Sequence, residues 1–129
     1  MWRILAYHLP DGSCPIRDWY ESQDFEVQAL FDVALTTLRA THDWEDTWQF
    51  KALTRNHVGL GEIRFKREGP PVQRFRPVGI WPPIVDKEFI LLLGCAKNRN
   101  IYVPRNAFEL ALDYKQKLEA GIGDARDYL

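Results

Sequence analysis

The sequence contains few residues that could cross-link a small protein or hold a metal ion. Only two cysteines occur among 129 residues, and Cys14 and Cys95 are isolated from each other and from any metal-ligand motif. The three histidines also lack the spacing of a zinc site. We therefore expect two reduced, buried thiols in a cytoplasmic protein that uses no metal ion and no other cofactor.

Long apolar runs are absent as well. The longest run, FILLLGCA over residues 89–96, has the length of a strand and falls short of the ~20 residues that a membrane-spanning helix needs. The first ten residues lack the small-residue cleavage pattern of a signal peptide. Apolar residues nevertheless make up 46% of the chain, which excludes intrinsic disorder. We expect one domain over residues 1–129 with no membrane partner.

The net charge is only −1, but the charges are distributed unevenly. Residues 1–50 carry three basic and nine acidic side chains, residues 51–105 carry eleven and four, and residues 106–129 carry three and five. A basic middle between acidic ends is typical of a protein that binds a polyanion. Opposite charges that neutralise one another on the folded surface would give the same counts, so both interpretations stay open.

The first half of the chain predicts a strand followed by two helices. Residues 2–8 alternate and are rich in β-formers, and Pro15 suits the first position of a short helix, PIRDWYES. A longer helix follows, with Ser22 or Asp24 as its cap. One face of that helix is apolar, because Val27, Leu30, Phe31, Ala34 and Leu38 recur at spacings of three and four.

The second half predicts three strands and a last helix. LGEIRFK alternates, VQRFRPVGIW follows a break at REGPP, and KEFILLLGCA is apolar on both faces, as expected for a strand covered on both sides. Pro104 then opens a helix that Gly121 ends. The order β-α-α-β-β-β-α predicts an α+β fold with a mostly antiparallel sheet, in which the two N-terminal helices cover one face.

Basic side chains gather on the two predicted neighbouring strands. If LGEIRFK and VQRFRPVG pair as a hairpin, Ile63 and Phe65 pack under the helices, and four cations share the opposite face with Glu62: Arg64, Lys66, Arg74 and Arg76. Like charges that face one another on a sheet are unfavourable. We therefore expect Glu62, an acidic partner chain or a phosphate ligand to offset them.

Two further features leave alternatives open. His57 lies before the turn GLG, where its imidazole either reaches the basic face or is exposed in the turn. Three tryptophans lie outside the clearest periodic segments: Trp44, Trp48 and Trp81. If several of them are exposed, they indicate a protein interface.

Several of these segments together resemble one known family. FKALTRNHVGLGEIRFKREG is similar to the pattern Lys-x-Leu, short turn, Gly-Leu-x-Glu-Leu-Arg-Phe of the RelE/ParE toxin superfamily, in its HigB-like, phage-derived branch. QRFRPVG stands where that family has its third strand. FILLLGCAKNRNIYVPRNAFELAL resembles the apolar strand, basic turn and Pro-led helix that follow. The resemblance covers nearly the whole chain and implies a RelE-like fold.

The resemblance also implies a function. Members of this superfamily are toxins of type II toxin–antitoxin systems, each held inactive by a cognate antitoxin protein. The RelE and HigB types are endoribonucleases that cut mRNA on the ribosome without a metal ion and so inhibit translation. Their attacking group is the 2′-hydroxyl of the RNA, so the protein has to position the backbone, neutralise charge and assist proton transfer.

Carried over residue by residue, the resemblance assigns Arg64, Arg74 and Tyr102 to catalysis. An arginine can bond two phosphate oxygens at once, and a tyrosine near the last helix can stack on a base or assist proton transfer. Four further residues are assigned to RNA binding: Lys66, Arg76, Lys97 and Arg99. The chain departs from the branch where LLGCAKN stands in place of a strand end with a histidine and an aromatic residue.

Two classes of function remain at this point. A ribosome-dependent mRNA endonuclease predicts that Arg64 and Arg74 converge in one cleft. A toxin that binds protein instead of cutting RNA, whether a ParE-like inhibitor of DNA gyrase or a degenerate member that retains only antitoxin binding, predicts a basic face without a convergent pocket.

Overall fold

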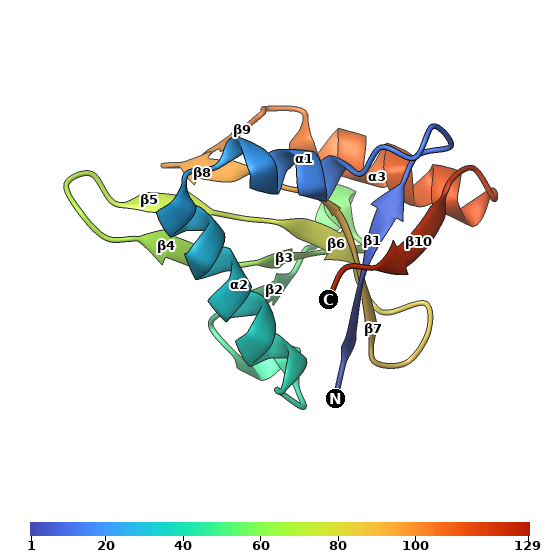
Figure 1. Cartoon of the computed structure of the whole chain (residues 1–129), viewed down its shortest axis with the longest axis horizontal. Helices are drawn as coiled ribbons and strands as arrows, with labels where there is room; N and C mark the ends of the chain where they lie inside the picture. The colour runs from blue at the N-terminus through green and yellow to red at the C-terminus, as the bar shows by residue number, and fades with distance from the viewer.

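The structure, a computed structural model that describes all residues from 1 to 129, has an α+β architecture (Figure 1). Its three α-helices are α1 (Pro15–Ser22), α2 (Phe25–Arg39) and α3 (Ala107–Glu119), and two short 3₁₀-helices are η1 (Trp44–Asp46) and η2 (Arg55–His57). Its strands are β1 (Arg3–His8), β2 (Phe50–Ala52), β3 (Leu60–Ile63), β4 (Phe65–Arg67), β5 (Gln73–Phe75), β6 (Val78–Ile80), β7 (Glu88–Leu93), β8 (Ala96–Asn98), β9 (Ile101–Val103) and β10 (Asp124–Asp127).

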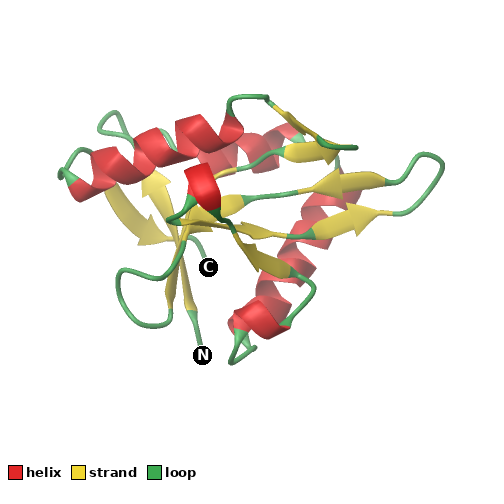
Figure 2. Ribbon diagram, turned by 180° about the vertical axis from the view of Figure 1, so that it is seen from behind, coloured by secondary structure: helices red, strands yellow, loops and turns green.

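The strands form two sheets. The larger one has the order β10-β1-β7-β6-β3-β2, and the smaller one has the order β4-β5-β8-β9. Neighbouring strands are antiparallel except β1 and β7, which run parallel. The helices α1 and α2 lie in front of the strands in Figure 1, and α3 lies on the opposite side, as the reverse view in Figure 2 shows.

Two apolar cores lie on the two faces of the larger sheet. Alternation along β7 places Phe89 and Leu91 in the core under α1 and α2, and Ile90 and Leu92 in the core under α3. Strand β1 divides its side chains in the same way. The expectation that KEFILLLGCA is covered on both faces is confirmed, since both helical layers shield these central strands from water.

The helix signals in the sequence are largely confirmed. Pro15 is the first residue of α1, and the Asp24 side chain caps α2 by accepting a hydrogen bond from the Val27 N–H at 3.0 Å. Gly121 follows α3 with a φ of +78°, a conformation that favours glycine. However, α3 begins at Ala107, so Pro104 precedes the helix by three residues. No helix combines the length and the apolar character that crossing a membrane requires.

The predicted order of strands is wrong in detail, because three predicted strands are each divided in two. LGEIRFK becomes β3 and β4, VQRFRPVGIW becomes β5 and β6, and KEFILLLGCA becomes β7 and the start of β8. Each of the three thus passes from one sheet into the other. The divisions fall side by side at Arg64, at Arg76 and Pro77, and at Gly94 and Cys95. There the backbone N–H of Arg64 bonds the carbonyl of Gln49, and the Arg76 N–H bonds that of Cys95. Strands β2, β9 and β10 are additional.

Candidate nucleic-acid interface

One row of polar side chains crosses the entire smaller sheet. Lys66 faces Arg74, Arg74 faces Lys97, and Lys97 faces Tyr102, from β4 through β5 and β8 to β9. We call these four residues the basic row. Because strands lie about 4.8 Å apart, the row extends over about 14 Å. The sequence predicted its members individually, and the register places them in one line.

The other face of this sheet is apolar and belongs to the core. Phe65 and Phe75 face each other in the row adjacent to Lys66 and Arg74, and their stacked rings lie 5.1 Å apart. Phe65 also stacks on Phe31 of α2 at 5.7 Å. This packing fixes β4 and β5 against the helix, so the alternate side chains of these strands have to face outward. The predicted hairpin is thus confirmed, and so is the outward direction of Lys66 and Arg74.

A hollow of about 260 Å³ collects the predicted cations at one end of the basic row. Its lining consists of Trp48, Arg64, Phe65, Lys66, Arg74 and Arg76. A neighbouring hollow of about 210 Å³ is lined partly by Arg74 and Lys97. Arg74 therefore lies between two concave, positively charged surfaces. Arg64 and Arg74 do lie in one hollow, as the endonuclease interpretation required.

The cations around this hollow differ in how they are compensated. The Nε atom of Arg64 donates a 2.9 Å hydrogen bond to Glu62, and Lys66 lies 3.2 Å from the exposed carboxylate of Glu68. Arg74 is exposed and makes no ion pair and no side-chain hydrogen bond. Its guanidinium, with Lys66 and Lys97 on either side in register, is the site at which an added anion would be most favourable.

Glu62 does not lie on the solvent face, where the alternation had placed it. It is fully buried, and its Oε2 atom accepts the bond from Arg64 and lies 3.3 Å from Nε of Arg76, an ion-pair distance without hydrogen-bond geometry. Its Oε1 atom accepts a 2.7 Å hydrogen bond from the hydroxyl of Tyr102. We call these four residues the Glu62 cluster. It forms where the strands bend between the sheets, and it offsets two of the cations internally.

Burial dominates the electrostatics of this cluster. It raises the pKa of Tyr102 well above its ordinary value, and the hydrogen bond to Glu62 adds to that shift. Burial lowers the pKa of Arg76, against the opposing effect of Glu62. The adjacent thiol of Cys95, which donates to the Arg76 carbonyl, has a pKa raised to about 12, again chiefly by burial. Tyr102 and Cys95 therefore stay protonated at neutral pH.

The other predicted residues lie around the far end of the row. The ammonium of Lys97 lies 5.4 Å from the centre of the Tyr102 ring, a cation–π contact. Arg99 lies in the exposed turn between β8 and β9 and lines neither basic hollow. His57 is half-buried, with its ring 4.6 Å from that of Phe108, and it lines a third hollow together with Tyr102. It is therefore not a freely exposed turn residue.

Four of the five tryptophans form two groups, and the fifth, Trp19, packs against Phe31 in the core. Trp2, Trp44 and Trp81 pack together, with ring centres 4.5 to 5.8 Å apart, so Trp44 and Trp81 are not a bare interface. Trp48 alone is largely exposed, at 68%, and it faces the basic hollow. Sequence reasoning did not assign Trp48 to the site. Its place in a turn between two predicted elements, four residues from Trp44, gave no periodic signal.

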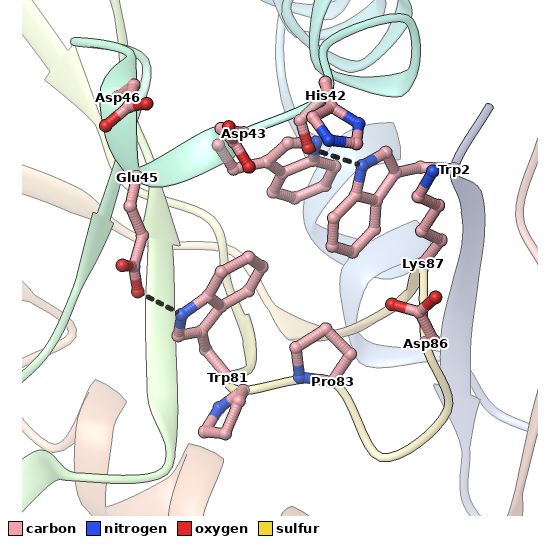
Figure 3. Close-up of a pocket in the computed structure, with 11 residues that line it drawn as sticks. Trp2, His42, Asp43, Glu45, Asp46, Trp81, Pro83, Asp86 and Lys87 are labelled. Carbon is pink, nitrogen blue, oxygen red and sulfur yellow. Dashed lines mark hydrogen bonds between the residues drawn. The ribbon is translucent and has the colours of Figure 1, made fainter.

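The largest hollow, of about 580 Å³, has the opposite charge (Figure 3). Trp2 and Trp81 form part of its wall, and the carboxyl side chains around it are those of Asp43, Glu45, Asp46 and Asp86. Glu45 accepts a 2.6 Å hydrogen bond from the Trp81 indole. Such a surface repels an anionic ligand, so this hollow does not suit nucleic acid, whereas the basic row does.

Comparisons of the chain with models of protein families, with curated proteins and with solved structures find no match.

Proposed function

We propose that the chain is a type II toxin of RelE-like fold that binds single-stranded RNA on the basic row and cleaves mRNA on the ribosome. The observation that carries this proposal is Arg74, an uncompensated guanidinium that lies between two basic hollows, with Lys66 and Lys97 opposite it on either side. The family resemblance supplies the ribosome as the setting and an antitoxin protein as the cytoplasmic partner.

The charge arrangement suits a phosphate backbone better than a single small anion. Three cations in register offer successive contacts along about 10 Å, a geometry that follows an extended chain of phosphates. Without a ligand these cations repel one another, because they face each other directly across the strands. A bound backbone would replace that repulsion with attraction.

In the proposed cleavage, the RNA 2′-hydroxyl attacks the neighbouring phosphorus and displaces the 5′-oxygen of the next nucleotide. Arg74, with Arg64 beside it, would stabilise the negative charge that develops on the phosphoryl oxygens. One group must take the proton of the 2′-hydroxyl, and another must give a proton to the leaving oxygen. Tyr102 stays protonated and donates to Glu62, so it does not serve as the base. His57 provides an imidazole in the hollow that Tyr102 also lines, whereas neither Arg64 nor Arg74 lines that hollow.

The Glu62 cluster favours a second candidate, a non-cleaving member of the same fold that binds protein. Two of the three predicted catalytic residues, Arg64 and Tyr102, are bonded to a buried carboxylate within the chain. A toxin that had lost cleavage, or one that inhibits gyrase, could keep these residues for stability alone. This alternative leaves the exposed charge of Arg74 without a role.

The decisive experiment is expression of the gene without its neighbours, followed by measurement of translation and of DNA supercoiling. We expect translation to stop, and the purified chain to cut mRNA only when ribosomes are present. Arg64→Ala combined with Arg74→Ala should abolish growth arrest while the circular dichroism spectrum stays unchanged. Arg74→Ala alone is the sharper test, because Arg64 also supports the Glu62 cluster.

Arg126→Ala provides the matched control, since Arg126 is exposed on β10 and pairs only with Asp124 beside it. It should remain fully toxic. Arrest of supercoiling with normal translation would instead support the gyrase alternative. Full toxicity of Arg74→Ala would show that the basic row is not the site.

A further inference from the structure

Trp48 is the most exposed of the five tryptophans. Trp2 and Trp44 are 7% and 1% exposed, and Trp19 and Trp81 pack against the core, whereas Trp48 is 68% exposed. It occupies the turn between η1 and β2. This indole borders a hollow lined mainly by cations, so it is available to a ligand that combines an aromatic ring with negative charge.

The structure holds Trp48 beside the cations. The next residue, Gln49, accepts a 2.7 Å hydrogen bond from the backbone N–H of Arg64, which ties the turn to the bend between the two sheets. Phe50 then enters β2, and its ring is buried among the tryptophans of the core. The turn is thus anchored on its C-terminal side, and the indole borders the hollow that Arg64 and Arg74 also line.

We propose that Trp48 is a stacking platform for an unpaired base, and that the phosphate next to this base binds Arg74. This inference rests on the proposed function and narrows its substrate to a single strand with an accessible base at this hollow. Aromatic side chains beside a positive groove bind single strands in this way, because every base has a π-face. In a duplex the bases stack on one another, so they cannot reach the indole.

The volume and composition of the hollow agree with one nucleotide. About 260 Å³ accommodates a base on the indole, and its remaining polar lining is entirely cationic, with no carboxylate among the lining side chains. Sequence preference should therefore be weak, since stacking does not read the hydrogen-bonding edge of a base. A protein partner that covers Trp48 would require a continuous apolar surface, whereas basic residues surround this indole.

The test uses three RNA probes of equal length: a uridine oligonucleotide, the same backbone with abasic sites, and a duplex. We expect the wild-type chain to bind the uridine strand about tenfold more tightly than the abasic strand, and to bind the duplex no better than the abasic strand. Trp48→Ala should bind the uridine and abasic strands equally. Trp48→Phe should recover part of the difference, because a smaller ring still stacks.

Fluorescence provides a second readout, since the uridine strand should quench the emission of the exposed Trp48, and this quenching should disappear in Trp48→Phe. Val58→Ala, at another exposed apolar turn residue, is the matched control and should behave as wild type. Equal binding of uridine and abasic strands by the wild type would overturn the platform and leave the phosphate site intact. Failure of the wild type to bind any strand at low salt would overturn the proposed function itself.

Discussion

The hydroxyl of Tyr102 lies 2.7 Å from the carboxylate of Glu62, although 40 residues separate the two in the chain. This contact joins β9, an edge of the smaller sheet, to β3 inside the larger one. Glu62 is completely buried, so its charge is stable only with the two arginines that approach its other oxygen. The basic hollow is consequently built on a cluster in which one buried carboxylate partly compensates two arginines.

Glu62→Gln should lower the free energy of unfolding by about 3 kcal/mol, because it leaves the guanidiniums of Arg64 and Arg76 without a counter-charge. Urea denaturation measures the change. Glu119→Gln removes an exposed carboxylate that pairs with Lys115 and should cost about 0.5 kcal/mol or less. If the two variants are equally stable, the Glu62 cluster does not hold the sheets together.

Tyr102→Phe should reduce the decrease in the free energy of unfolding that occurs as the pH becomes alkaline. The folded-state pKa of Tyr102 is raised above the ordinary value of 10.0, so its contribution is complete below that pH and is lost as the pH rises through the folded pKa. Unfolding free energies measured from about pH 8 to about pH 11 should therefore fall more steeply in the wild type. The remaining tyrosines titrate in both proteins, so the difference between them reports Tyr102. Parallel curves would contradict the buried hydrogen bond.

Arg74→Gln should separate binding from stability. The residue makes no ion pair and faces two cations, so its replacement should leave the free energy of unfolding unchanged or raise it by up to about 0.5 kcal/mol. Affinity for single-stranded RNA should nevertheless fall, and the slope of log K against log salt should become less steep by about 0.7. Isothermal binding series at several salt concentrations give that slope. An unchanged slope would show that Arg74 contacts no phosphate.

Asp24 should make the attachment of α2 to β4 sensitive to acid. Its carboxylate accepts a 2.6 Å hydrogen bond from Arg67 and also caps α2, and these bonds lower its pKa, with Arg67 the larger cause. Its contribution to stability is thus present above the unfolded pKa and is lost as the pH falls through the folded pKa. Asp24→Asn keeps a capping oxygen but lacks the charge, so it should lose the acid dependence and be less stable than the wild type at neutral pH, and Asp24→Ala, which also lacks the cap, should be less stable still. Thermal unfolding at pH values on either side of the carboxylate range compares the three proteins. Identical acid profiles would refute the ion pair.

Local patterns predicted the parts of the fold that depend on one segment at a time. The stripe on α2 and its Asp24 cap follow from helical spacing, and the buried character of β7 follows from its unbroken apolar run. The outward direction of Arg74, opposite Phe75, follows from the alternation of a strand. These features are set by bonds between neighbours in the chain, so they need no knowledge of the partners.

The arrangement of the site depended on contacts between distant segments. Alternation placed Glu62 with Arg64 and Lys66 in solvent, but its face of β3 is covered, and Tyr102 of β9 reaches Glu62 there. Trp48 joined the hollow because the backbone of Arg64 bonds Gln49. Neither outcome has a signature in the local pattern.

The sequence alone determined that this chain forms α+β layers and that one ribbon carries outward-facing cations, because periodicity fixes which side of an element is apolar. The tertiary structure decided which of those cations are free. The single carboxylate of Glu62 pairs with both Arg64 and Arg76, while the strand register sets Arg74 between two lysines, where it makes no ion pair. Charge compensation acts through space, so only the folded chain could separate the residues that stabilise the site from the one that remains open to a ligand.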